Sequence, residues 1–244
     1  MSYIRSDDAA LYYEEYGAGQ NLVLLPGIFG TIELDWRRFI PDLARNFHTI
    51  AIDTRGHGRT NNPSGTLSPD QVLSDLRTLF DTLEIERAFL CTTGHMGILQ
   101  VMFAIEEPER ILGLILHSPR LSRFQAVALS PPFPEDVLQR AHAAANGPEG
   151  WEALRHGTAQ LFQLIEEQVV PTLRALRIPV LATIDDEADA EEEADINLLV
   201  GMLSDCTIGR LHDGGRRIST VQKEEFIRTV VAFSSRICGA QTNI

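Results

Sequence analysis

The sequence predicts an α/β protein in which helices cover both faces of a mostly parallel central sheet. Short apolar runs alternate with turns and longer amphipathic stretches, which is the pattern of parallel strands joined by helices. Most of these runs are nearly continuous in apolar residues, as expected for strands covered on both faces. A chain of 244 residues suits one such domain. The expected strands are residues 22–25, 49–53, 88–92, 112–116, 180–184 and 207–211.

The remaining local elements follow from turn and capping signals. Residues 3–6 and 10–15 flank the turn-prone pair Asp7 and Asp8, which predicts an opening hairpin. Ser68, Pro69 and Gln71 supply a cap, a first-turn proline and a capping-box partner for a helix over 68–83. Further helices are expected at 36–45 and 226–235.

Residues 119–177 do not follow the strand–helix alternation. They contain several prolines and helical patterns at 135–145 and 151–176, the second interrupted at Pro171. An insertion after the carboxyl end of a strand lies over the place where open α/β sheets bind ligands. We therefore expect a core of residues 1–118 and 178–244 and a short helical lid of residues 119–177.

Composition narrows the choice of partners and compartment. A net charge of −13 disfavours nucleic acid, and the absence of a long apolar run disfavours a membrane span. Three cysteines without metal-ligand spacing, and an N-terminus without an apolar signal core, favour a cytoplasmic protein with reduced thiols. We expect no cofactor and no metal, a small molecule as substrate or ligand, and leave a homodimer open. The acidic run 185–195 is interpreted as a solvated loop and helix start.

Several motifs follow the predicted strands: LLPGIFG at 24–30, AIDTRGHGRT at 51–60 and CTTGHMG at 91–97. Together with the order of elements, they resemble the α/β-hydrolase superfamily over nearly the whole chain outside the lid. That resemblance implies a nucleophile on a strained turn between a strand and a helix, flanked by small residues. It also implies an acid after a later strand and a histidine before the last helix.

None of these three positions holds the expected residue type. Matching the small flanking residues places His95 at the tip of the nucleophile turn, which we prefer, whereas counting without gaps places Gly94 there. Ala188 falls at the acid position, and Asp186 and Asp189 are the nearby substitutes. Arg216 stands where the histidine belongs, and arginine stays protonated at physiological pH. His212 is a weaker candidate for the base.

Hydrolysis through an acyl-enzyme requires nucleophile, base and acid together. We therefore expect non-covalent acid/base chemistry, of a lyase, dehydratase, cyclase, isomerase or decarboxylase type, on a small, partly apolar carbonyl compound. His95 would transfer protons, and Arg216 would stabilise an anion. Backbone groups at Gly27, Ile28 and Met96 would assist it.

Two alternatives remain open: an inactive protein that binds a ligand or partner, and a hydrolase whose triad has migrated, with Ser118 as nucleophile. The residues expected to line the pocket are Phe29, Trp36, Ser118, Phe124 and Trp151.

Overall fold

The computed structural model describes residues 2–121, 131, 133–165, 169–212 and 220–241. Within them, eight strands form one sheet in the order β1-β2-β4-β3-β5-β6-β7-β8. β1 and β2 pair antiparallel, as do β2 and β4, and the other neighbours are parallel. The strands are β1 (Ser2–Ser6), β2 (Ala9–Tyr16), β3 (Gln20–Leu24), β4 (Phe47–Ile52), β5 (Ala88–Thr93), β6 (Ile111–His117), β7 (Val180–Asp185) and β8 (Cys206–Leu211). The predicted α/β class is confirmed.

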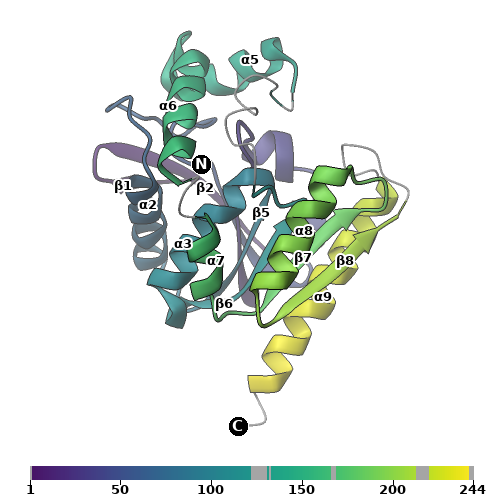
Figure 1. Ribbon diagram of the computed structural model, residues 1–244. Helices are drawn as coiled ribbons and strands as arrows, with labels where there is room; N and C mark the ends of the chain where they lie inside the picture. The colour runs from purple at the N-terminus through teal and green to yellow at the C-terminus, as the bar shows by residue number, and fades with distance from the viewer. Residues whose placement is uncertain (1, 122–130, 132, 166–168, 213–219, 242–244) are drawn as a thin grey trace.

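Helices cover both faces of this sheet (Figure 1). One apolar core contains side chains of α2, α3, α7 and α8, and the other contains side chains of η1, α1 and α9. The longer helices are α2 (Pro69–Thr82), α3 (Gly97–Glu106), α5 (Glu135–Asn146), α6 (Gly150–Ile165), α7 (Val169–Ala175), α8 (Ala190–Met202) and α9 (Thr220–Gln241). The short ones are η1 (Ile32–Trp36), α1 (Ile40–Leu43), η2 (Gly94–Met96) and η3 (Pro108–Arg110).

The capping prediction is confirmed, but some helix predictions are wrong. Ser68 and Gln71 form the predicted capping box of α2. The continuous helix expected over 36–45 is instead a π-helix, η1, followed by the single turn α1. Pro171 does not interrupt a helix either, because it lies in the first turn of α7, where proline is tolerated.

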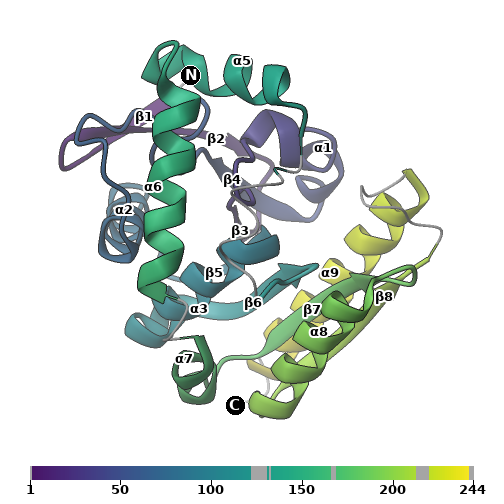
Figure 2. The same cartoon turned by 45° about the horizontal axis from the view of Figure 1, so that its top comes forward.

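Within the expected lid, α5 and α6 lie together at one end of the sheet (Figures 1 and 2). α7 lies beside α3 and α8 instead and packs against both. The lid boundaries at 119–177 stay a prediction, and from here we use the term lid helices for α5 and α6 only.

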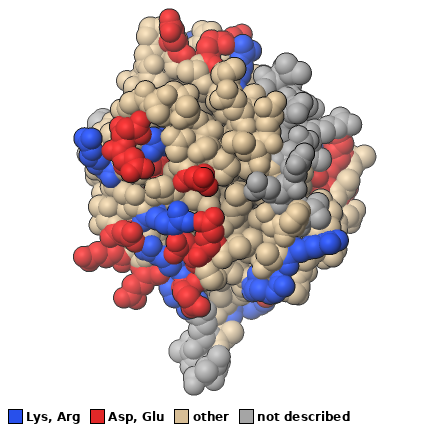
Figure 3. All heavy atoms as spheres, turned by 60° about the vertical axis from the view of Figure 1, so that its left-hand side comes forward, with Lys and Arg blue, Asp and Glu red and all other residues tan. Residues whose placement is uncertain are grey.

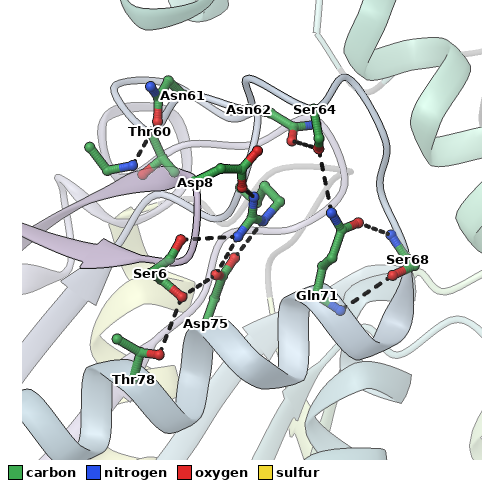
Figure 4. A network of polar contacts seen from close by, with 12 residues as sticks. Ser6, Asp8, Thr60, Asn61, Asn62, Ser64, Ser68, Gln71, Asp75 and Thr78 are labelled. Atoms are coloured by element: carbon green, nitrogen blue, oxygen red, sulfur yellow. Dashed lines mark hydrogen bonds and ion pairs between the residues drawn. The ribbon is translucent and has the colours of Figure 1, made fainter.

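The arginine of the 51–60 motif holds the opening hairpin to the rest of the molecule. Arg55 is 1% exposed and donates from Nε and Nη2 to the two carboxylate oxygens of Asp75 on α2, at 3.0 and 2.8 Å. It also donates to Asp8 at 2.6 Å, and Ser6 Oγ donates to Asp75 at 2.6 Å. Figure 4 shows Ser6, Asp8 and Asp75 gathered in this network. Arg55 is thus part of the scaffold.

On the face of the molecule that Figure 3 shows, the surface carries charges of both signs. Acidic and basic side chains are interspersed there. Ion pairs of this kind join Arg77 on α2 to Glu107 at 2.8 Å and Arg110 to Asp81 at 2.7 Å. Across the described ranges, no helix combines the length and apolar character that a bilayer crossing needs.

Candidate active site

The turn between β5 and α3 is the centre of the candidate site. β5 ends at Thr93, and residues 94–96 form one turn of 3₁₀-helix before α3 begins at Gly97. Gly94 has φ of +66°, whereas His95 is outside the left-handed region. Left-handed backbone is strained for any residue with a Cβ. The strained position of the turn is therefore Gly94. This geometry favours Gly94 as the tip of the turn, and not His95, which the small flanking residues had suggested.

The tip of this turn is open on the side where a side chain would project. A Cβ built on Gly94 has no described atom within 4 Å, whereas a Cβ on Gly97 would lie 3.2 Å from Leu116 Cδ2. The base of α3 is therefore closely packed, while the tip offers space for a substrate atom or a water molecule.

The turn after β3 lies directly against the end of β5. A Cβ on Gly27 would approach Thr93 Cγ2 to 2.8 Å, so only glycine allows the two turns to lie this close. Phe29 is fully buried and has φ of +60°, a rare conformation for an aromatic residue. Among the described residues, no hydrogen bond is found for the Ile28 N–H. We call residues 26–31 the first turn. An amide such as that of Ile28, without a partner in the described ranges, is the kind of group that stabilises an oxyanion.

The Gly27 amide is already engaged by a carboxyl group that the sequence reasoning missed. Gly27 N–H donates to Asp35 Oδ2 at 2.8 Å, and Asp35 belongs to the π-helix η1. Burial raises the pKa of Asp35 to about 7, and the nearby Asp53 acts in the same direction. Such a near-neutral pKa suits proton transfer, and π-helical segments often occur at functional sites. The sequence signal that could have found this group is an acidic residue, Asp35, directly before Trp36.

Lid helix α6 covers both turns. The ring of Phe162 lies 5.6 Å from the ring of His95, whose residue is only 8% exposed. At the other end of α6, Trp151 meets Phe29 edge to face at 4.8 Å. The structure therefore brings Phe29 and Trp151 together, and it places His95 under the other end of the same helix.

The acids after β7 occupy different environments. Asp189 caps α8 by accepting hydrogen bonds from the amides of Glu191 and Glu192, which holds its pKa below the usual range. Asp186 is exposed, and its amide donates to Leu211 O at 2.9 Å. Asp185, the last residue of β7, is half-buried and accepts a hydrogen bond from Gln222 at 3.0 Å. Burial, with Glu192 and Asp186 nearby, raises the pKa of Asp185 to about 6.

The other proposed residues are less central or lie outside the described residues. Arg216 and Phe124 lie outside the described residues. Trp36 is buried in the core, where Nε1 donates to Leu25 O at 2.9 Å, and these contacts give no support to a lining role. Ser118 follows β6 with φ of +41°, and its amide donates to Thr183 O at 2.7 Å. His212 is exposed and contacts Glu225 on α9.

A cavity of about 240 Å³ lies apart from the two turns. It is formed between residues 56–65 and the lid helices, with Asn62 and Asn146 in its lining. It includes neither Gly94 nor His95, so we do not assign it to the candidate site.

Comparison with known proteins settles the family. A sequence profile described as the alpha/beta hydrolase fold matches residues 20–163, which is more than half of the chain. The chain belongs to the α/β-hydrolase family.

Relatives of this α/β-hydrolase act on several small molecules. The 3-oxoadipate enol-lactonase 2 of Acinetobacter baylyi is 26% identical over 96% of each chain. A putative carbamate hydrolase, RutD, of Azorhizobium caulinodans is 32% identical over 48% of this chain and 43% of its own.

Two crystal structures share the fold over nearly their full lengths. A meta-cleavage product hydrolase of Pseudomonas fluorescens has a TM-score of 0.79 at 19% identity, covering 97% of this chain and 98% of its own. The enol-lactonase of Burkholderia xenovorans has a TM-score of 0.75 at 20% identity, covering 95% and 99%. At these identities the structural likeness shows the fold alone.

Proposed function

We propose that this α/β-hydrolase is an enzyme that works without a nucleophile on the β5–α3 turn. It carries out acid/base chemistry on a small, partly apolar carbonyl compound. His95 transfers the proton, Arg216 stabilises the anion that forms, and the Ile28 amide assists. The lyase, dehydratase, cyclase, isomerase and decarboxylase types all fit this description.

The observation that carries the proposal is Gly94 at the strained position of the turn. A residue without a side chain cannot form a covalent intermediate, so an acyl-enzyme at this position is excluded. The open space above Gly94 lies where the nucleophile would otherwise project. A substrate atom placed there would be close to His95, the next residue in the chain.

The surroundings of His95 favour a partly apolar substrate. Phe162 covers its ring, and Phe29 and Trp151 form an aromatic contact at the neighbouring turn. Apolar walls with a few polar groups are typical of small-molecule sites. The relative named for an enol-lactone supports a carbonyl compound as the substrate.

A second candidate is hydrolysis by direct attack of water, with His95 as general base and no covalent intermediate. The relatives found by sequence favour it, because they are named as an enol-lactonase and a putative carbamate hydrolase. The open space at Gly94 supports it as well. The two candidates differ in their products, since only hydrolysis adds the elements of water.

The test is a panel of lactones, enol-lactones and vinylogous diketones incubated with wild type, His95→Gln and Arg216→Ala. We expect both substitutions to lower kcat/KM, His95→Gln by about 100-fold or more. The matched control is His48→Gln. His48 lies at the start of β4, away from the carboxyl ends of the strands that carry the site, so this variant should keep wild-type activity. Mass spectrometry of products distinguishes isomerisation or elimination from hydrolysis.

The same samples test the alternatives. Quenched reactions should contain no covalent adduct on the protein. An adduct lost in Ser118→Ala would establish a migrated triad, and binding without turnover across the panel would establish a ligand-binding protein. Turnover that survives both His95→Gln and Arg216→Ala would overturn the roles proposed for them.

A further inference from the structure

A single buried histidine joins lid helix α5 to both the first turn and the 51–60 motif. His142 is 0% exposed. Its Nδ1 accepts a hydrogen bond from the Gly58 amide at 3.0 Å, and its Nε2 lies 3.1 Å from the carbonyl oxygen of Phe29. Residues more than 80 positions apart in sequence thus meet on one imidazole ring.

The partners of His142 fix which nitrogen carries the proton. An amide can only donate, so Nδ1 must be unprotonated, and a carbonyl oxygen can only accept, so Nε2 must carry the hydrogen. Burial lowers the pKa of His142 to about 4, in agreement with this neutral form. One tautomer of one ring therefore satisfies both contacts.

The carbonyl that His142 holds belongs to the strained residue of the first turn. Phe29 has φ of +60°, and such conformations persist only where surrounding contacts enforce them. Trp151 of α6 stacks on the His142 ring, with 15° between the ring planes, and also packs edge to face on Phe29. Phe29 is thus held through its backbone by α5 and through its ring by α6.

From these contacts we infer that His142 is a positioning residue that couples the seating of the lid to the geometry of the first turn. The inference builds on the proposed function, because it concerns the turn that carries the Ile28 amide. When α5 is seated, the Phe29 carbonyl is fixed and the Ile28 amide keeps its orientation. When α5 is displaced, the turn loses that hydrogen bond.

The chain offers a matched control on the same helix. Asn146, one turn after His142, donates to Gly56 O at 3.3 Å and Thr60 O at 3.1 Å and accepts from the Asn62 amide at 3.1 Å. It docks α5 on the 51–60 motif but does not contact the first turn. Asn146→Ala therefore removes the contacts of this side chain to residues 56–62, while α5 stays seated through His142 and keeps the contact to Phe29.

The experiment compares wild type, His142→Phe, His142→Gln and Asn146→Ala by hydrogen exchange. His142→Phe keeps a ring to stack on Trp151 but loses both hydrogen bonds. We expect exchange in residues 26–31 to rise at least tenfold in His142→Phe, whereas Asn146→Ala should raise it only in residues 56–62. His142→Gln can still donate to Phe29 O and should restore most of the protection. Nitrogen NMR of wild type should show the Nε2–H tautomer.

Kinetics add a second readout once a substrate is in hand. We expect His142→Phe to lower kcat at least tenfold with KM changed less than threefold, and Asn146→Ala to leave kcat unchanged. Wild-type exchange at 26–31 in His142→Phe, or the Nδ1–H tautomer in wild type, would overturn the inference. If His142→Phe does not fold, His142→Gln and the tautomer decide it. Exchange and NMR need no substrate, so failure of the proposed function is distinguishable from failure of this coupling.

Discussion

Gly94 and Asp35 are the two residues that set the candidate site apart from an arrangement built around a nucleophile. Gly94 occupies the strained position of the β5–α3 turn, so the turn keeps the shape associated with a nucleophile but carries none. Asp35 places a buried carboxyl group against the Gly27 amide of the first turn, and Gly27 in turn lies close to Thr93 at the end of β5. A missing side chain and an additional carboxyl group thus lie on adjoining turns.

Replacing Gly94 by alanine separates backbone strain from lost function. Left-handed backbone penalises a Cβ by about 1 kcal/mol, so Gly94→Ala should be slightly less stable than wild type in urea unfolding. Gly65→Ala is the matched control, because Gly65 has φ of +68° and open space around its Cβ but lies elsewhere. We expect similar stability losses and a loss of turnover only in Gly94→Ala. Equal activity in both variants would show that the space at Gly94 is not used.

Asp35 should make stability depend on pH. Its folded pKa of about 7 lies above its ordinary value, so its stabilising contribution is complete below pH 4 and is lost as the pH rises to 7. The substitution Asp35→Asn mimics the protonated form, and its amide oxygen can still accept from the Gly27 amide. We expect this variant to match wild type near pH 4 and to exceed its free energy of unfolding by about 2 kcal/mol at pH 8. Denaturant titrations across this range check it; a difference independent of pH would contradict it.

At the scale of elements, the site depends on which segments lie over which strand ends. α6 reaches the turn after β3 through Trp151 and the turn after β5 through Phe162. α5 adds His142, and the π-helix η1 supplies Asp35. The scaffold beneath is tied together in a different way, by the buried ion pair between the 51–60 motif and α2.

That ion pair should matter far more than an exposed one on the same helix. Asp75→Asn leaves the buried Arg55 with one charged partner fewer, and breaking a buried pair typically costs about 3 to 5 kcal/mol. In the control, Asp81→Asn removes the pair with Arg110, in which Asp81 is 67% exposed, and should cost less than about 1 kcal/mol. Thermal unfolding compares them. Equal melting temperatures for the two variants would mean that the network does not secure the hairpin.

For the whole molecule, the sequence predicted the sheet well because strands β3 to β7 are mostly buried and rich in consecutive apolar residues, a property visible in the sequence. It did not predict the contact of Asp35, since that contact depends on the Gly27 amide of the first turn lying against η1. At the turn tip, small flanking residues led to a preference for His95, whereas the backbone conformation, which only coordinates reveal, favours the open alternative, Gly94. Asp185 was not proposed from the sequence, because its half-buried position beside Gln222 of α9 depends on how distant segments pack.

Helix α6 also has a mechanical consequence. Trp151 and Phe162 are three helical turns apart, about 16 Å along the axis, and midway between them a Cβ on Gly157 would lie 3.3 Å from Leu67 Cβ. Leu154 and Leu161 of the same helix are also buried, so α6 rests on the body along its length and not at one point. One helix therefore covers both strand ends, and displacing it as a rigid element would uncover both turns together.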